Sequence, residues 1–67
     1  MKKFEVVLWQ VFNGVQVKGA AEFAHAVAAY KFARSMQGRQ EVEDVEIRHH
    51  HVDGQGRPTY YEIFFLY

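Results

Sequence analysis

The most conspicuous group of side chains with chemical potential is the run His49-His50-His51. Alternate side chains of a β-strand share a face, so His49 and His51 would point the same way and Asp53 could join them. Alternate histidines on a strand can ligate zinc, but a site needs three or four convergent ligands. His25 is a candidate third ligand, yet nothing in the sequence brings it close. We therefore expect no metal and no cofactor, and interpret the run as a half-exposed polar strand end.

A second group, the carboxylates Glu43, Asp44 and Glu46, clusters at the start of the same expected strand. Acid–base catalysis requires paired carboxylates, or a histidine with a carboxylate, inside a pocket. Their alternation and the adjoining polar residues are instead typical of a solvated edge. A chain of 67 residues also has little volume for a pocket of about 300 Å³ or more. We assign no catalytic residue and predict a non-enzymatic protein.

The overall charge argues against direct binding of nucleic acid. Eight Lys and Arg balance eight Asp and Glu, whereas nucleic-acid affinity comes mainly from an excess of cations on one face. A local patch of Arg39, Arg48 and Arg57 beside the histidines remains an alternative. Zero Cys excludes disulfides and thiolate metal sites. Without an apolar run near the roughly 20 residues that span a bilayer, or a signal-peptide core, we expect one cytoplasmic domain, residues 1–67, with no membrane contact.

The order of the expected elements indicates an α+β fold. Asn13-Gly14 favours a two-residue type I′ hairpin, and Gly38 suits the left-handed residue after a helix. The Ala-rich segment is typical of a helix, and the others are rich in β-branched and aromatic residues. We predict a ββαββ chain that forms a four-stranded antiparallel sheet with one helix packed on one face. The expected strands are 3–12, 15–18, 42–52 and 59–67, the helix is 20–37, and the expected strand order is second, first, third, fourth.

Side-chain alternation assigns each strand residue to one face of the sheet. The uncharged set is assigned to the core: Phe4, Val6, Leu8, Phe12, Val15, Val17, Val45, Ile47, His49, Tyr61, Ile63 and Phe65. The other set is assigned to the outside: Lys3, Glu5, Val7, Trp9, Val11, Gln16, Lys18, Glu46, Arg48, His50, Tyr60, Glu62, Phe64 and Leu66. For the last strand, the opposite parity would bury Glu62, which is costly unless the carboxylate is paired.

The outer face is the candidate binding surface, because an apolar centre rimmed by mixed charge is typical of interfaces. Trp, Tyr and Arg dominate binding hot spots. The candidate protein-binding residues are Trp9, Arg48, His50, Arg57, Tyr60 and Phe64. An alternative is that Trp9 lies over the stem of Lys18 as a cross-strand pair and serves only stability.

The expected hairpins and helix lie in the segments VFNGVQVKGAAEFAHAVAAYKFARSM, VEDVEIRHHHV and TYYEIFFLY. With these segments, the chain resembles small phage-encoded inhibitors in topology and length. These include anti-CRISPR proteins and phage inhibitors of host enzymes. The resemblance implies a protein that docks on a larger host protein, or on a protein–nucleic-acid complex, and blocks its activity. It transfers no functional residue. A small homodimeric structural domain and an RNA- or DNA-binding domain are the alternatives.

Overall fold

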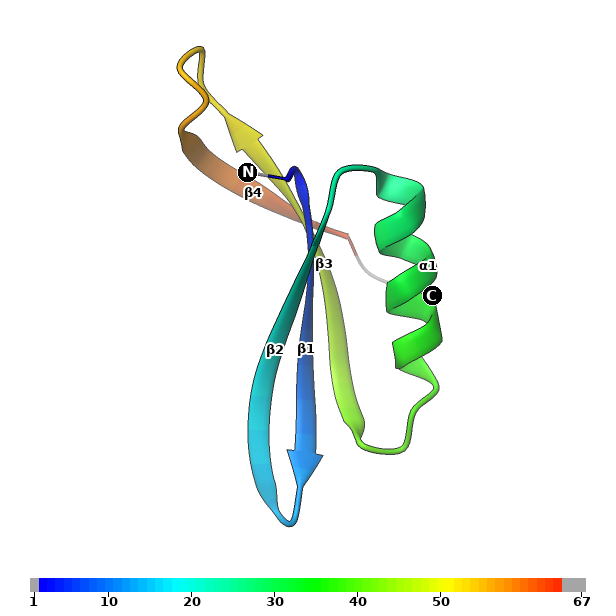
Figure 1. The fold of residues 1–67 in the computed structure, drawn as a ribbon. Helices are drawn as coiled ribbons and strands as arrows, with labels where there is room; N and C mark the ends of the chain where they lie inside the picture. The colour runs from blue at the N-terminus through cyan, green and yellow to red at the C-terminus, as the bar shows by residue number, and fades with distance from the viewer. Residues whose placement is uncertain (1, 65–67) are drawn as a thin grey trace.

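The computed structural model describes residues 2–64, which form four strands and one helix in the order β-β-α-β-β (Figure 1). All neighbouring strands are antiparallel, and the sheet order is β2-β1-β3-β4. The predicted α+β class and strand order are therefore confirmed. The elements are β1 (Phe4–Phe12), β2 (Val15–Phe23), α1 (Ala26–Gln37), β3 (Val42–Val52) and β4 (Pro58–Phe64).

The β1–β2 hairpin is longer than predicted. Asn13 and Gly14 both have positive φ, as a type I′ turn requires, and Trp9 pairs with Lys18 as expected. The pairing then continues to the far end of β1, so residues 20–23 belong to β2 and the predicted helix start at residue 20 is wrong. Helix propensity is a weak preference, and a full ladder of cross-strand bonds overrides it. Gly38 has φ −87, so the predicted left-handed helix end is also wrong.

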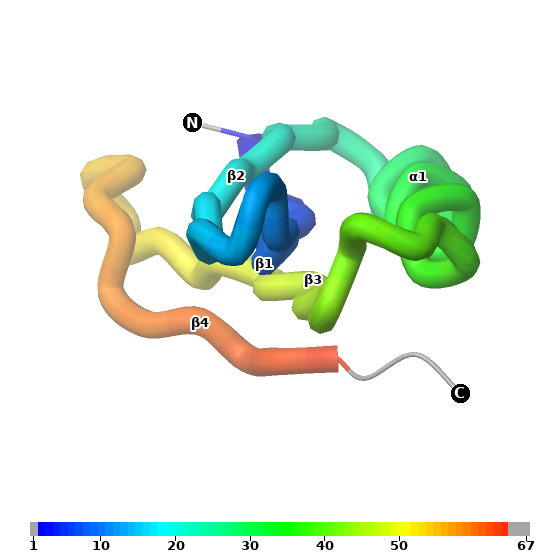
Figure 2. Tube along the Cα trace, turned by 90° about the horizontal axis from the view of Figure 1, so that it is seen from below, coloured from blue at the N-terminus to red at the C-terminus, as the bar shows by residue number. Residues whose placement is uncertain are grey.

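The core is small and joins the sheet to the helix. Val6, Leu8 and Ile47 from the strands cluster with two alanines of α1, Ala29 and Ala33. Alanine side chains allow close approach between a helix and a sheet. Figure 2 shows α1 running beside the strands. Partly buried side chains complete the cluster: Phe4, Phe23, Phe32, Met36 and Val45.

The face assignments at the β1–β2 turn need correction. Phe12, Val15 and Val17, which were predicted to be core residues, are exposed. The turn projects beyond the end of α1, so no helix covers these side chains (Figure 1). Val7, which was predicted to face solvent, is instead buried on the face opposite Val6.

The predicted parity of β4 is wrong. Ile47 pairs with Phe64 and His51 pairs with Tyr60, which places Phe64 and Tyr60 on the core side of the sheet. The argument against this parity was the burial of Glu62. That cost does not arise, because this carboxylate is exposed. A register shift between His51 and Val52 accompanies the pairing.

The observed parity also changes the face on which other β4 residues lie. Tyr61 and Ile63, which were predicted to be core residues, are exposed and lie on the outer side opposite His50 and Arg48. The predicted positions of Phe65 and Leu66 lie outside the described residues. Within residues 2–64, no helix has the length and apolar character needed to cross a membrane.

Candidate functional site

Polar side chains on the outer face, the side of the sheet opposite Val6 and Leu8, are paired with one another. His50 Nε2 lies 3.1 Å from Glu5 Oε1, and Arg48 lies 4.0 Å from the same oxygen. Arg48 also donates a short hydrogen bond to Glu46, and its guanidinium lies 4.8 Å above the ring of Tyr61. We call Glu5, Glu46, Arg48, His50 and Tyr61 the outer polar cluster.

The charged groups of this cluster are paired with one another rather than with solvent alone. The pKa of Arg48 is raised above its usual value, mainly by its hydrogen bond to Glu46. Burial of the guanidinium lowers this pKa in part, and nearby negative charge raises it further. The side chains of Arg48 and His50 are only 18% and 14% exposed. A partner that engaged either residue would first have to break existing pairs. The outer polar cluster therefore resembles a structural feature more than a free contact surface.

Trp9 lies on the outer face and is half-buried. Lys18 Nζ sits 5.9 Å from the centre of its ring, across the β1–β2 pair. This geometry agrees with the alternative in which Trp9 and Lys18 form a stabilising cross-strand pair.

The other two histidines of the run lie on the opposite face, within a row of aromatic rings. The rings of Phe4 and His49 are stacked, with 4.6 Å between their centres, and the ring centres of His49 and His51 are 4.4 Å apart. The His51 ring in turn stacks on the Tyr60 ring, with 4.5 Å between their centres. His51 Nε2 is also 2.8 Å from a carboxylate oxygen of Glu62 but lacks hydrogen-bond geometry. In residues 2–64, no three His, Cys, Asp or Glu side chains are placed to hold a metal ion.

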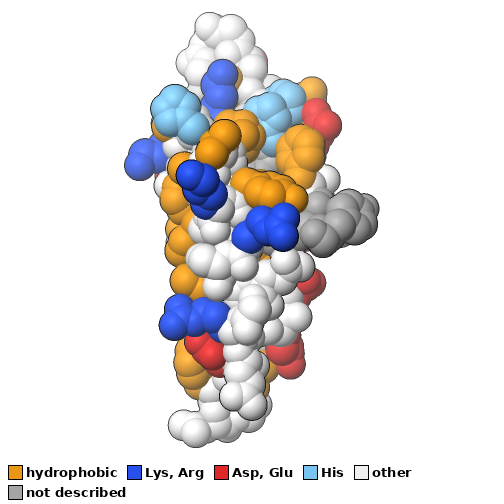
Figure 3. Space-filling model, turned by 90° about the vertical axis from the view of Figure 1, so that its right-hand side faces the viewer, with side chains coloured by type: hydrophobic (Ala, Val, Ile, Leu, Met, Phe, Trp, Pro, Cys, Tyr) orange, Lys and Arg blue, Asp and Glu red, His pale blue; other side chains and the backbone are white. Residues whose placement is uncertain are grey.

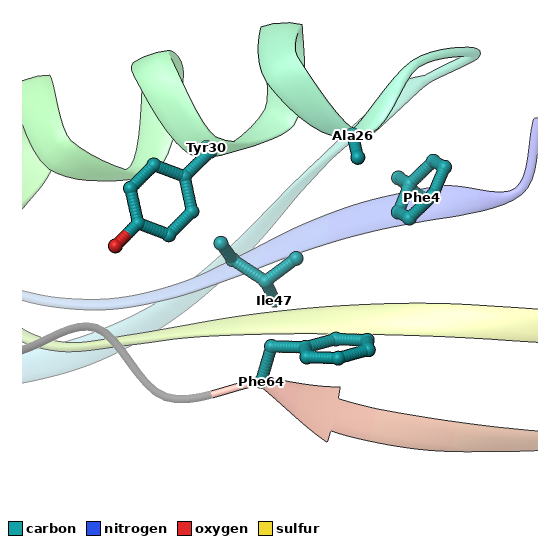
Figure 4. A pocket seen from close by; sticks show the side chains of 5 residues that line it. All are labelled: Phe4, Ala26, Tyr30, Ile47 and Phe64. Carbon is teal, nitrogen blue, oxygen red and sulfur yellow. The ribbon is translucent and has the colours of Figure 1, made fainter.

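An apolar hollow opens on the helix side of the sheet. It has a volume of about 210 Å³ and is lined by Phe4, Ala26, Tyr30, Ile47 and Phe64. Figure 4 shows Ala26 and Tyr30 on the helix side of the hollow and the other three side chains on β1, β3 and β4. Sequence reasoning missed this site because it placed Phe64 on the outer face. The alternating pattern itself allowed the observed parity once Glu62 was free to remain in solvent.

Two cations of α1, Lys31 and Arg34, lie near this hollow. Between Glu22 and Glu41 the chain has no acidic residue but carries Lys31, Arg34 and Arg39. The Arg34 guanidinium lies 5.7 Å above the ring of Tyr30, and Arg39 pairs with Glu41. Figure 3 shows Lys, Arg and His side chains among hydrophobic ones over this side of the molecule, with Asp and Glu side chains toward its edges.

A shallow apolar depression continues from the hollow along α1, where Ala26, Val27, Tyr30 and Lys31 line it. We call the hollow and this depression together the helix-side surface.

The six predicted binding residues do not form one patch. Trp9, Arg48 and His50 lie on the outer face, whereas Tyr60 and Phe64 lie on the helix side. Arg57 lies in the β3–β4 loop, where its backbone N–H donates to Asp53 Oδ1 at 2.9 Å.

Comparison of the chain with protein-family models, curated proteins and solved structures finds no match in any of the three. The function must therefore be argued from the geometry of the described surfaces.

Proposed function

We propose that this chain is a non-enzymatic protein-binding module whose contact surface is the helix-side surface. The observation that carries the proposal is the exposure of large apolar side chains around a hollow: Tyr30 is 40%, Phe64 44% and Val27 65% exposed. Such a patch is typical of an interaction site. The polar groups of the outer face, by contrast, already have partners within the chain.

The charges around the hollow define the partner's chemistry. Lys31 borders the apolar depression, and Arg34 stacks on Tyr30 at its edge. A partner that fits would insert an apolar side chain into the hollow and place carboxylates beside these two cations. We therefore propose a protein surface or segment in which an aliphatic or aromatic anchor is flanked by acidic residues.

The mode of action that we propose is occlusion of a larger protein. The molecule measures 43 × 23 × 16 Å, so its larger faces are wide enough to cover a site on a larger protein. The resemblance in topology and length to phage-encoded inhibitors favours the same mode.

A titration with an acidic peptide tests the proposal. The probe is a short peptide with one central Phe between Glu and Asp residues, and NMR chemical shifts are followed in the intact chain. We expect shifts at Tyr30, Lys31 and Phe64, and weaker binding by about tenfold for Tyr30→Ala, because buried aromatic anchors contribute about 1–2 kcal/mol or more. Phe12→Ala, at an exposed aromatic residue away from the hollow, is the matched control.

Trp9→Ala separates this proposal from the expectation based on the sequence. If the helix-side surface is the site, a folded Trp9→Ala protein retains peptide binding. Loss of binding in Trp9→Ala together with unchanged binding in Tyr30→Ala would contradict the proposal and restore the outer face as the site.

A single-stranded nucleic acid is the second candidate partner. The row of rings from Phe4 to Tyr60 lies on the same side of the sheet as the cationic helix. Aromatic rings with nearby cations are a common arrangement for stacking bases. A salt titration with random oligonucleotides tests this candidate, because absence of binding at low ionic strength excludes it.

A further inference from the structure

The outer edge of β2 is an unpaired strand edge. β2 lies at the end of the sheet, and its backbone packs against β1 and α1 among the described elements. The Gln16 side chain also reaches across β1 and donates a hydrogen bond to Glu43 of β3 at 2.9 Å. Its residues from Val17 to Phe23 contain no Pro, and its pairing with β1 shows no register shift. The opposite edge, at β4, begins with Pro58, and the pairing of β4 with β3 is shifted there, so both features disfavour strand addition at that end.

The hairpin register identifies which backbone groups face this open edge. Phe12 and Val15 flank a two-residue turn, so they form a hydrogen-bonded pair, and hydrogen-bonded pairs then recur at every second residue. The remaining residues of β2 therefore direct their N–H and C=O groups outward: Gln16, Lys18, Ala20 and Glu22.

Contacts on the other side of β1 agree with this alternation. The Val11 N–H donates to the Glu41 carbonyl at 2.9 Å, and the His50 N–H donates to the Lys3 carbonyl at 2.7 Å. Odd-numbered residues of β1 and of its N-terminal flank thus bond toward β3, and even-numbered residues are left for β2.

We infer that a second copy of this chain pairs with the outer edge of β2, antiparallel and centred on Ala20. In this register Lys18 lies opposite Glu22 of the second copy, and the twofold symmetry repeats the pair. On the other side of the sheet, Val17 lies opposite Phe23 of the second copy. The segment VKGAAEF is therefore complementary to itself in both charge and apolar character.

Other registers allowed by the backbone lack this complementarity. A pair centred on Gly19 places Lys18 opposite Ala20, and a pair centred on Ala21 places Glu22 opposite Ala20. Neither brings opposite charges directly together. Within residues 2–64, neither Lys18 nor Glu22 belongs to an ion pair. Lys18 Nζ lies over the Trp9 ring, so its charge has no carboxylate partner among these residues and can pair with Glu22 of the second copy.

The extended sheet also suits a chain with so small a core. Only six hydrophobic side chains of the described residues are buried: Val6, Val7, Leu8, Ala29, Ala33 and Ile47. Pairing two β2 strands would create one eight-stranded sheet with no open β2 edge. No residue of β2 lines the hollow, so the inference stands independently of the proposed function.

Charge reversal tests the register by sedimentation equilibrium from micromolar to millimolar protein. The wild-type chain is expected to show a monomer–dimer equilibrium. Lys18→Glu and Glu22→Lys each place like charges opposite one another twice, and are expected to weaken association by about tenfold. Lys31→Glu, a reversal on α1, is the matched control and leaves the dimer unchanged. Circular dichroism checks that each variant folds.

Mixing the two variants gives the decisive result. An equimolar mixture of Lys18→Glu and Glu22→Lys restores both ion pairs in a heterodimer, so association recovers, as it does in the double variant. A wild-type chain that remains monomeric throughout the range overturns the inference. A dimer that neither reversal weakens, or a mixture that does not recover, also overturns it, whatever the peptide titration shows.

Discussion

Truncating one buried and one exposed valine tests how much of the stability of this chain comes from its few buried apolar side chains. Val6 and Val15 belong to the two strands of one hairpin, but Val6 is 0% exposed and Val15 is 62% exposed. Both Val→Ala changes remove the same atoms and lose the same intrinsic preference for strand structure. The difference between their effects on the free energy of unfolding therefore isolates burial.

The structure sets the size of this difference. Two buried carbon groups are worth about 0.8 kcal/mol each, and the cavity left among Leu8, Ala29 and Ile47 adds to the loss. Val6→Ala should thus cost about 2 kcal/mol more than Val15→Ala. A domain of this size rarely gains more than about 3–5 kcal/mol from its core, so Val6→Ala removes a large part of the total stability.

Urea denaturation followed by circular dichroism, at a concentration low enough to hold the chain monomeric, measures both variants. We expect the urea m value to be similar for the two variants. In thermal melts, the melting temperature of Val6→Ala is expected to lie about 8–16 °C below that of Val15→Ala. Equal losses in the two variants, or a larger loss in Val15→Ala, would refute the assignment of the core to the helix side of β1.

Two further predictions concern the turn and the outer polar cluster. Gly14 has φ +78, so Gly14→Ala should lower stability by about 1 kcal/mol, whereas Gly38→Ala, at φ −87, should be neutral or stabilising; thermal melts that rank the two in the opposite order would contradict the backbone assignment. Arg48→Met leaves the carboxylates of the outer polar cluster without their cation and should cost about 1–3 kcal/mol, while Arg57→Met, in an exposed loop, should change stability by less than about 0.5 kcal/mol; similar urea midpoints for both would show that the cluster is not structural.

The sequence alone determined the elements, their order and the first hairpin. Asn13-Gly14 specifies a tight turn through local backbone preference, and that turn fixes the register of Trp9 against Lys18. The sheet order was predicted from a helix that runs back along the sheet and brings the third strand beside the first, and the observed order agrees. The elements and the hairpin are local features, which explains why they can be read from one chain, whereas the sheet order depends on the path of the helix between the two hairpins.

Tertiary structure decided where β2 ends and which face of β4 lies on the core side of the sheet. Ala20 and Ala21 have high helix propensity, but pairing along the whole of β1 outweighs a preference of a few tenths of a kcal/mol per residue. The parity of β4 depends on where the core stops, because Glu62 lies on the core side and yet its carboxylate stays exposed beside His51. Long-range pairing between strands also forms the hollow beside Phe64 and brings Arg48 and His50 to their carboxylate partners. No local sequence pattern encodes these contacts.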